Sequence, residues 1–393
     1  MYYFSIIQLK YSLISFSKDD LRLFFRYLFV LVFCWLVLNY EFVLYAHYQT
    51  IFHHDTTNYA EIADFIKLYG AENQLRASNL YKEYRYTTLY HFPEIYLTGL
   101  ISEVLNISSL QTIQFIVNPL LLFGVFTAIQ NFIDSQNIKF SWWISIICIL
   151  TTGGLHIEHG GNYIWWYDYK FYYHQASIVN YHFNKFYLPF WLLLNAVTSM
   201  KEDKLELSFL FFSFLAISNF TLFVFGVSVM GLIALWSIVR QNSKLKKILF
   251  YFLYGVIYLL WILKIYSESN TNNMIGNVSL LQFDFKYMVG VTLSVLLNNF
   301  LLFILGLLML FVLYKTQKIT QKFIQISFVL LISLGMSLIF STYLYPLNFF
   351  DSFQPFFNAW ILIKWLMPIG ILVIVLKYLY SFIQKIYVSA FIL

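Results

Sequence analysis

The chain has 393 residues, a formal net charge of +6, 60% hydrophobic residues and only 11% charged residues. A soluble domain is about 45–50% apolar and about 25% charged, so this composition excludes an ordinary soluble globular protein. The apolar stretches are long enough to cross a bilayer and lack the period-two alternation of barrel strands. The predicted fold class is therefore all-α integral membrane.

Apolar runs bounded by charges or turn residues predict about ten transmembrane helices in one polytopic membrane domain, residues 1–393. The expected spans lie near 27–46, 109–133, 139–155, 186–200, 206–219, 220–239, 248–265, 287–313, 323–343 and 359–380. The fifth and sixth runs are expected to form a hairpin whose short first helix breaks at Asn219. Cys34 and Cys148 both lie inside apolar runs, so a loop disulfide is not expected.

The residues before the first run lack a small-residue cleavage site, so an uncleaved first anchor is expected. Basic residues resist translocation, and their distribution between alternate connections therefore predicts the orientation. One side carries most of them, namely Lys10, Lys18, Arg22, Arg26, Lys139, Lys201, Lys204, Arg240, Lys244, Lys246, Lys247, Lys315, Lys318, Lys322, Lys377 and Lys385. The other side carries Lys67, Arg76, Lys82, Arg85, Lys170, Lys185, Lys264 and Lys286. Both termini are therefore expected in the cytoplasm.

Two polar connections, about 47–108 and about 156–186, are expected on the outer side of the membrane. All eight histidines and most acidic residues fall on that side. Because such groups transfer protons and bind metals, the sequence assigns candidate chemistry to these two outer loops.

The first outer loop is expected to contain two amphipathic helices that lie on the membrane surface. In HHDTTNYAEIADFIKLYG, Asn58 and Glu61 form an N-x-x-E capping pattern, and Gly70 ends the apolar periodicity. A second helix is expected to begin at Pro93, with Glu94 in its first turn. These two segments predict a structured loop.

Asp55 is the first candidate catalytic residue, because it follows the first span closely and is flanked by His53 and His54. A carboxylate at this position could deprotonate an incoming hydroxyl as a general base. Aspartate is also among the best helix caps, and the helix expected near Asn58 could use one. Both roles remain open at the level of the sequence.

The second outer loop opens with His156, Glu158 and His159. Glu158 is the second candidate catalytic carboxylate. Imidazole and carboxylate groups bind divalent ions, so His54, His156 and His159 are candidate ligands of a divalent metal ion, the one cofactor considered. The spacing is not H-E-x-x-H, and interfacial histidines more commonly hydrogen-bond to acids or to water.

Four basic residues are candidate phosphate-binding groups: Arg76, Arg85, Lys170 and Lys364. Arginine offers a bidentate fork to phosphate oxygens, and lysine offers a point charge. The competing interpretation pairs the loop residues with nearby acids or lipid headgroups. Lys364 lies inside the last span, where a cation is a functional candidate unless its side chain reaches the interface.

The second outer loop is also rich in aromatic residues. Aromatic faces stack on sugar rings, and polar groups beside them bind hydroxyls. The candidate sugar-binding residues are Trp165, Trp166, Tyr167, Asp168 and His174. An aromatic belt at the membrane interface is the competing explanation for most of them.

This layout resembles the GT-C superfamily of integral-membrane glycosyltransferases. The shared features are an acid after the first span (Asp55), surface helices near 58–69 and 94–105, an acidic second outer loop (Glu158 and Asp168) and the hairpin at 206–239. The resemblance covers roughly the first 240 residues in layout and includes no diagnostic motif. The chain departs from the family in having a single first-loop acid and no large soluble domain after the spans.

The resemblance implies an inverting transfer on the outer face, from a sugar carried on polyprenyl phosphate or diphosphate to a glycan or lipid-linked acceptor. Asp55 would take the proton of the acceptor, while basic groups stabilise the leaving phosphate. The chain also looks like the polymerases of bacterial surface polysaccharides, such as O-antigen or capsule. This similarity implies a bacterial inner membrane, a periplasmic active face, lipid as the surrounding partner and no nucleic acid.

A transporter or flippase of a lipid-linked glycan is the alternative function. It would bind the same substrate without forming a bond, and it would place ionisable residues deep in several spans. The deep charges of this sequence are essentially Glu41 and Lys364, so the enzyme is favoured.

Overall fold

The computed structural model describes residues 18–44, 54–69, 92–138, 140–152, 185–240, 245–267, 283–315, 320–344 and 354–392. All regular structure in these residues is helical, which confirms the all-α prediction. The elements are α1 (Lys18–Leu44), α2 (His54–Tyr69), α4 (Phe92–Leu105), α5 (Ser109–Thr112), η1 (Ile113–Val117), α6 (Asn118–Asp134), α7 (Ser141–Thr151), α8 (Tyr187–Lys201), α9 (Leu205–Ser218), η4 (Phe220–Leu222), α10 (Phe223–Arg240), α11 (Leu245–Ser267), α12 (Phe285–Asn298), α13 (Phe300–Lys315), α14 (Gln321–Leu344) and α15 (Gln354–Ile392).

Four helical segments of the described residues are long and apolar enough to cross a membrane: Asp19–Asn39, Ser109–Asp134, Gln321–Tyr343 and Gln354–Leu376. A fifth is added if α12 and α13, which meet at a bend of 73°, count as one span. The chain is therefore an all-α membrane protein, but the prediction of about ten spans is wrong by this measure.

Several predicted spans form helices that are shorter than the bilayer core. The run 139–155 forms α7, whose 11 residues cover about 16 Å, roughly half of the hydrocarbon thickness. The run 186–200 forms the 15 residues of α8, and 206–219 forms the 14 residues of α9. Many of their apolar side chains are buried against other helices, so apolarity here reports protein contacts as well as lipid contacts.

The predicted hairpin of α9 and α10 is confirmed, with its break at Asn219. This residue has extended backbone angles, φ −148° and ψ 118°, between the end of α9 and the short turn η4. The two helices approach each other closely at Gly226, where an added Cβ atom would lie 2.5 Å from the Cβ of Ala216. Glycine at position 226 is therefore what allows this hairpin to close.

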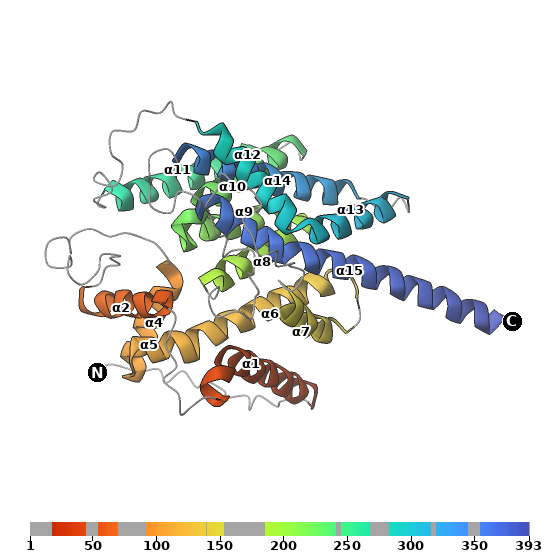
Figure 1. Ribbon diagram of the computed structural model, residues 1–393, viewed down its shortest axis with the longest axis horizontal. Helices are drawn as coiled ribbons and strands as arrows, with labels where there is room; N and C mark the ends of the chain where they lie inside the picture. The colour runs from red at the N-terminus through yellow and green to blue at the C-terminus, as the bar shows by residue number, and fades with distance from the viewer. Residues whose placement is uncertain are drawn as a thin grey trace, which may run out of the picture.

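The central helix of the bundle is the first half of α15, in which every residue from Gln354 to Trp365 is buried. Helices α8, α10, α13 and α14 contact it, and Figure 1 shows it running through the bundle and out toward the C-terminus. The ring of Trp365 lies edge-on to Phe186 at 6.2 Å and to Phe190 at 5.2 Å between centroids. These rings fix α8 against α15.

Lysine side chains join the helices at the end of the bundle that lies away from α2 and α4. The ammonium of Lys322, on α14, donates to the Asp203 carboxylate at 2.5 Å and to the carbonyl of Lys201 at 2.6 Å. Lys201 in turn donates to the carbonyl oxygen of Ser135, just after α6. A cation at a helix C-terminus interacts favourably with the helix dipole, so this lysine cluster ties α6, α8 and α14 together.

Candidate functional site

Helix α2 places the first candidate catalytic residue. It begins at His54, so Asn58 lies in its second turn, and the predicted cap at Asn58 is wrong. No proline or glycine interrupts residues 54–57, and the buried Thr56 packs in the first turn, so the helix extends one turn further back. Asp55 therefore belongs to the first turn, where negative charge interacts favourably with the helix dipole. The side chains of His54 and Asp55 lie outside the described part of the structure.

Helix α4 confirms that a second helix begins near Pro93, with Pro93 and Glu94 in its first turn, while its position on the membrane surface stays a prediction. It packs on α2 through an apolar cluster that includes Tyr59, Ala63 and Ile95. An added Cβ atom at Gly99 would lie 3.3 Å from the carbonyl oxygen of Ala63. Helices α2 and α4 therefore form one close-packed layer, here called the α2–α4 layer, which Figure 1 shows beside the start of the long helix α6.

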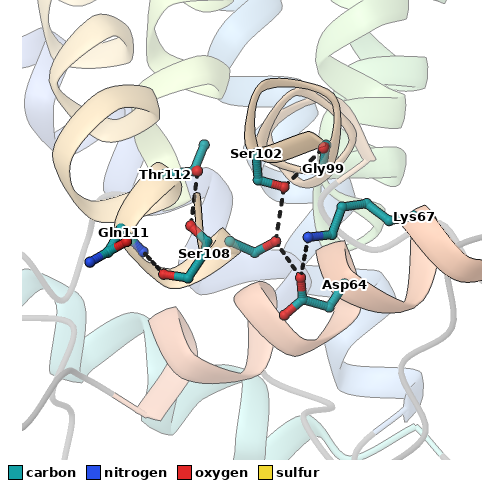
Figure 2. A network of polar contacts seen from close by, with 8 residues as sticks. Asp64, Lys67, Gly99, Ser102, Ser108, Gln111 and Thr112 are labelled. Carbon is teal, nitrogen blue, oxygen red and sulfur yellow. Dashed lines mark hydrogen bonds and ion pairs between the residues drawn. The ribbon is translucent and has the colours of Figure 1, made fainter. Parts of the chain in front are cut away.

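A polar network fastens the α2–α4 layer to α5 (Figure 2). The hydroxyl of Ser109 donates to the Asp64 carboxylate at 2.6 Å, and the hydroxyls of Ser109 and Ser102 are 3.2 Å apart. Lys67 pairs with the same carboxylate at 2.6 Å. Ser102 and Ser109 are buried, whereas Asp64 is half-exposed. The sequence reasoning did not select these residues, although serines within an apolar helix pattern were a usable signal.

A second polar contact lies where α1 meets the π-helical turn η1. The amide of Gln114 donates to the Asn39 side-chain oxygen at 3.1 Å, and the Asn39 amide donates to the carbonyl of Trp35 at 3.0 Å. Both side chains are buried. Single π-helical turns occur often at functional sites. This contact holds α1 to the helix that begins beneath the α2–α4 layer.

A third polar group lies at the break of the α9–α10 hairpin. The side-chain oxygen of Asn219 accepts from the backbone N–H of Thr221 at 3.1 Å and from its hydroxyl at 2.7 Å. Asn358, on the central helix α15, donates its side-chain amide to the Thr221 hydroxyl. All three side chains are buried. We call this group the Asn219–Asn358 cluster.

Lys364 lies on another face of α15. It follows Asn358 by six residues, which places it about 9 Å further along the helix and about 120° around it. Its neighbours on that face are Trp360, which stacks on Phe303 of α13 at 5.7 Å between centroids, and Met367. Lys364 is 3% exposed, so it is enclosed by protein and does not reach the surface as the snorkelling interpretation required. Its predicted role as a phosphate-binding cation stays a prediction.

The remaining predicted site residues lie outside the described residues. They comprise the second catalytic candidate, two metal candidates, and the loop candidates for phosphate and sugar binding. These residues are Arg76, Arg85, His156, Glu158, His159, Trp165, Trp166, Tyr167, Asp168, Lys170 and His174. Within the described ranges, no three His, Cys, Asp or Glu side chains form a group that could bind a metal ion. The predicted metal site thus stays a prediction.

Comparison with known proteins finds no matching family model, no matching curated protein and no matching solved structure.

Proposed function

We propose that the protein transfers a sugar from a polyprenyl phosphate or diphosphate to a glycan or lipid-linked acceptor, at the end of the bundle where the α2–α4 layer lies. The observation that carries the proposal is the attachment of α2. The apolar contacts of Tyr59 and Ala63 and the bond from Ser109 to Asp64 fix this helix, so the backbone of Asp55 has a defined position after α1. A general base needs such a fixed position to act on a bound hydroxyl.

The proposed reaction is a single displacement at the anomeric carbon. The Asp55 carboxylate takes the proton of the acceptor hydroxyl, whose oxygen forms the new bond to that carbon. The bond between the carbon and the phosphate oxygen breaks, and the phosphate leaves with the electron pair. Arg76, Arg85, Lys170 or Lys364 stabilises its charge, and Glu158 is a second candidate base or acid. Attack opposite the leaving group inverts the anomeric configuration.

The proposal also assigns an orientation in the membrane and roles to the remaining candidate residues. Basic residues resist translocation, so in this proposal the opposite end of the bundle, which carries Lys201 and Lys322, is the cytoplasmic end. The α2–α4 layer then faces the periplasm across a bacterial inner membrane, with both termini in the cytoplasm. Trp165, Trp166 and Tyr167 would stack on the sugar, and a divalent ion held by histidines remains a candidate cofactor.

The decisive experiment compares turnover of the wild-type protein with that of Asp55→Asn in lipid nanodiscs. A polyprenyl-linked glycan serves as donor and acceptor, and the product is detected by mass spectrometry. Loss of a general base lowers the rate by a factor of about 10²–10⁴, so Asp55→Asn should abolish detectable product.

Chelation by EDTA tests whether the reaction needs a divalent metal ion. Unchanged turnover of the wild-type protein in EDTA would exclude such a requirement.

Asp64→Asn is the matched control, because it removes a carboxylate from the same helix. Asparagine still offers a side-chain oxygen to the Ser109 hydroxyl, so the α2–α4 layer should persist and product should form. Equal product from Asp55→Asn and wild type would refute the assignment of the base.

A flippase is the second candidate function, and the interrupted helices favour it. Breaks at Asn219 and between α12 and α13 resemble the discontinuous helices from which transporters build substrate sites. The test places the protein in liposomes with the same lipid composition as the nanodiscs. If a fluorescent lipid-linked glycan crosses this bilayer with its mass unchanged, the protein is a flippase and not a transferase.

A further inference from the structure

The break at Asn219 creates polar groups within the apolar bundle. Helix α9 ends at Ser218, one extended residue follows, and η4 then leads into α10. The last carbonyls of a helix have no helical donors, and irregular backbone inside a membrane protein persists only where protein or a polar cavity surrounds it. A break in this place therefore requires polar partners.

The Asn219–Asn358 cluster supplies some of these partners but leaves two of its own groups unpaired. Thr221 links the two asparagines, because it donates to Asn219 and accepts from Asn358. In the part of the chain that the structure describes, the amide nitrogen of Asn219 and the amide oxygen of Asn358 have no hydrogen-bond partner. Asn219 is 1% exposed and Asn358 is 2% exposed, so bulk water does not pair with them.

The two unpaired groups limit the chemistry of any ligand that could pair with both of them. One is a donor and the other is an acceptor, and neither is charged. A hydroxyl group matches this pair, because it accepts one hydrogen bond while it donates another. A phosphate matches poorly, because it only accepts, and the buried cation Lys364 lies on another face of α15. The cluster therefore suits the neutral, hydroxyl-rich part of a substrate.

The Asn219–Asn358 cluster lies toward the end of the bundle where the sugar transfer is proposed to occur. Helix α9 runs away from the lysine cluster, so its last turn and Asn219 lie toward the α2–α4 layer, and α4 contacts α9. Trp365 follows Asn358 by seven residues, on nearly the same face of α15, and provides an apolar boundary further along the helix.

We propose that Asn219, Thr221 and Asn358 form a subsite for a sugar hydroxyl of the lipid-linked substrate, an inference that rests on the proposed function. The hydroxyl accepts from the Asn219 amide nitrogen and donates to the Asn358 amide oxygen. A single enclosed water molecule could make the same two bonds, and the experiment below separates the two occupants.

The test measures binding of two kinds of probe to the protein in nanodiscs, followed by tryptophan fluorescence. Farnesyl phosphate carries no sugar, and its glucosyl, galactosyl, mannosyl and N-acetylglucosaminyl derivatives each add one. At least one sugar derivative should bind more tightly than farnesyl phosphate. Asn358→Leu should weaken that derivative about tenfold, since it removes the hydrogen-bonding oxygen, and should leave farnesyl phosphate unchanged.

Two further variants keep the result interpretable if Asn358→Leu folds poorly. Asn219→Ser retains a side-chain oxygen for the N–H of Thr221 but removes the unpaired amide nitrogen, and it should show the same selective loss. Asn195→Leu is the control, because Asn195 is a half-buried asparagine of α8 whose side-chain amide donates to the Trp191 carbonyl of its own helix at 2.8 Å. It should leave both kinds of probe unaffected.

Three results would overturn the subsite: no derivative exceeds farnesyl phosphate, the Asn358 and Asn219 variants weaken all probes equally, or they change only thermal stability. The last result would show that the cluster has a structural role and binds no sugar. Failure of the proposed function is distinguishable, because selective sugar binding without turnover in the Asp55 experiment would retain the subsite and reject the transferase.

Discussion

The α9–α10 hairpin and the α2–α4 layer are both built on a glycine that faces an alanine, yet they are stabilised in different ways. In the hairpin, Gly226 meets the side chain of Ala216, and both sit within apolar helices. In the layer, the nearest neighbour of Gly99 is the carbonyl oxygen of Ala63, and hydrogen bonds from Ser102 and Ser109 add to the apolar contact. The hairpin thus depends on shape, whereas the layer combines shape with polar ties.

The largest effect is expected from Gly226→Ala. Its Cβ atom would lie 2.5 Å from the Ala216 Cβ atom and 2.9 Å from its Cα atom, so the helices must separate. Overpacking of this kind costs about 1–3 kcal/mol, to be measured as a loss of thermal stability in detergent. Gly231→Ala, on the same helix with no atom within 4 Å, should leave stability unchanged or raise it. Equal losses from both would contradict the close approach.

Ser109→Ala should have the next largest effect. It removes the hydroxyl between Asp64 and Ser102, at a cost of about 0.5–1.5 kcal/mol. Hydrogen exchange is the suitable measurement, because it should show faster opening of α2 and α4 and unchanged protection of α9. Ser228→Ala is the control, because it removes a serine hydroxyl that donates to the Val224 carbonyl within its own helix, α10. Uniform loss of protection across the bundle would show that the layer is not a separate unit.

Gly99→Ala should cost less than Gly226→Ala, because its closest neighbour is 3.3 Å away and needs to move by only a few tenths of an ångström. We expect a loss of at most about 1 kcal/mol, since alanine also favours the helix. The two glycine variants should be compared in one thermal unfolding series. A larger loss at Gly99 would reverse the comparison of hairpin and layer.

The smallest effect is expected from Lys322→Met, in the lysine cluster. The Asp203 partner is half-exposed, so the pair should contribute only about 0–1 kcal/mol. The contribution should shrink as salt is raised, because screening weakens exposed charges. Unfolding temperatures of wild type and variant should therefore converge in high salt. A difference that persists would mean that the bond to the Lys201 carbonyl carries most of the effect.

The sequence predicted features that have a local signal. Pro93 and Glu94 located the start of α4, and Asn219, a poor helix former between two apolar runs, located the break of the hairpin. The start of α2 was missed, because burial of Thr56 extends the helix past the capping pattern at Asn58. The number of spans was overestimated, because hydropathy does not separate helices buried in protein from helices facing lipid.

The polar contacts of the candidate site could not be predicted, because they join distant parts of the chain. Gln114 and Asn39 are 75 residues apart, and Asn358 and Thr221 are 137 residues apart. No pattern within a single helix specifies such partners. The burial of Lys364 was anticipated from its place in an apolar run, but its separation from the Asn219–Asn358 cluster required the three-dimensional structure.

The length of α15 and the proline within it determine where this helix bends most easily. Its 39 residues extend for about 58 Å, nearly twice the thickness of the hydrocarbon core, so a helix that begins beside the Asn219–Asn358 cluster is long enough to cross a bilayer and continue beyond it. Pro368 lacks the N–H that would bond to the carbonyl of Lys364, so the helix bends most easily at the depth of its buried cation. A displacement of the enclosed half relative to the other half would therefore change the bend of α15 at this turn.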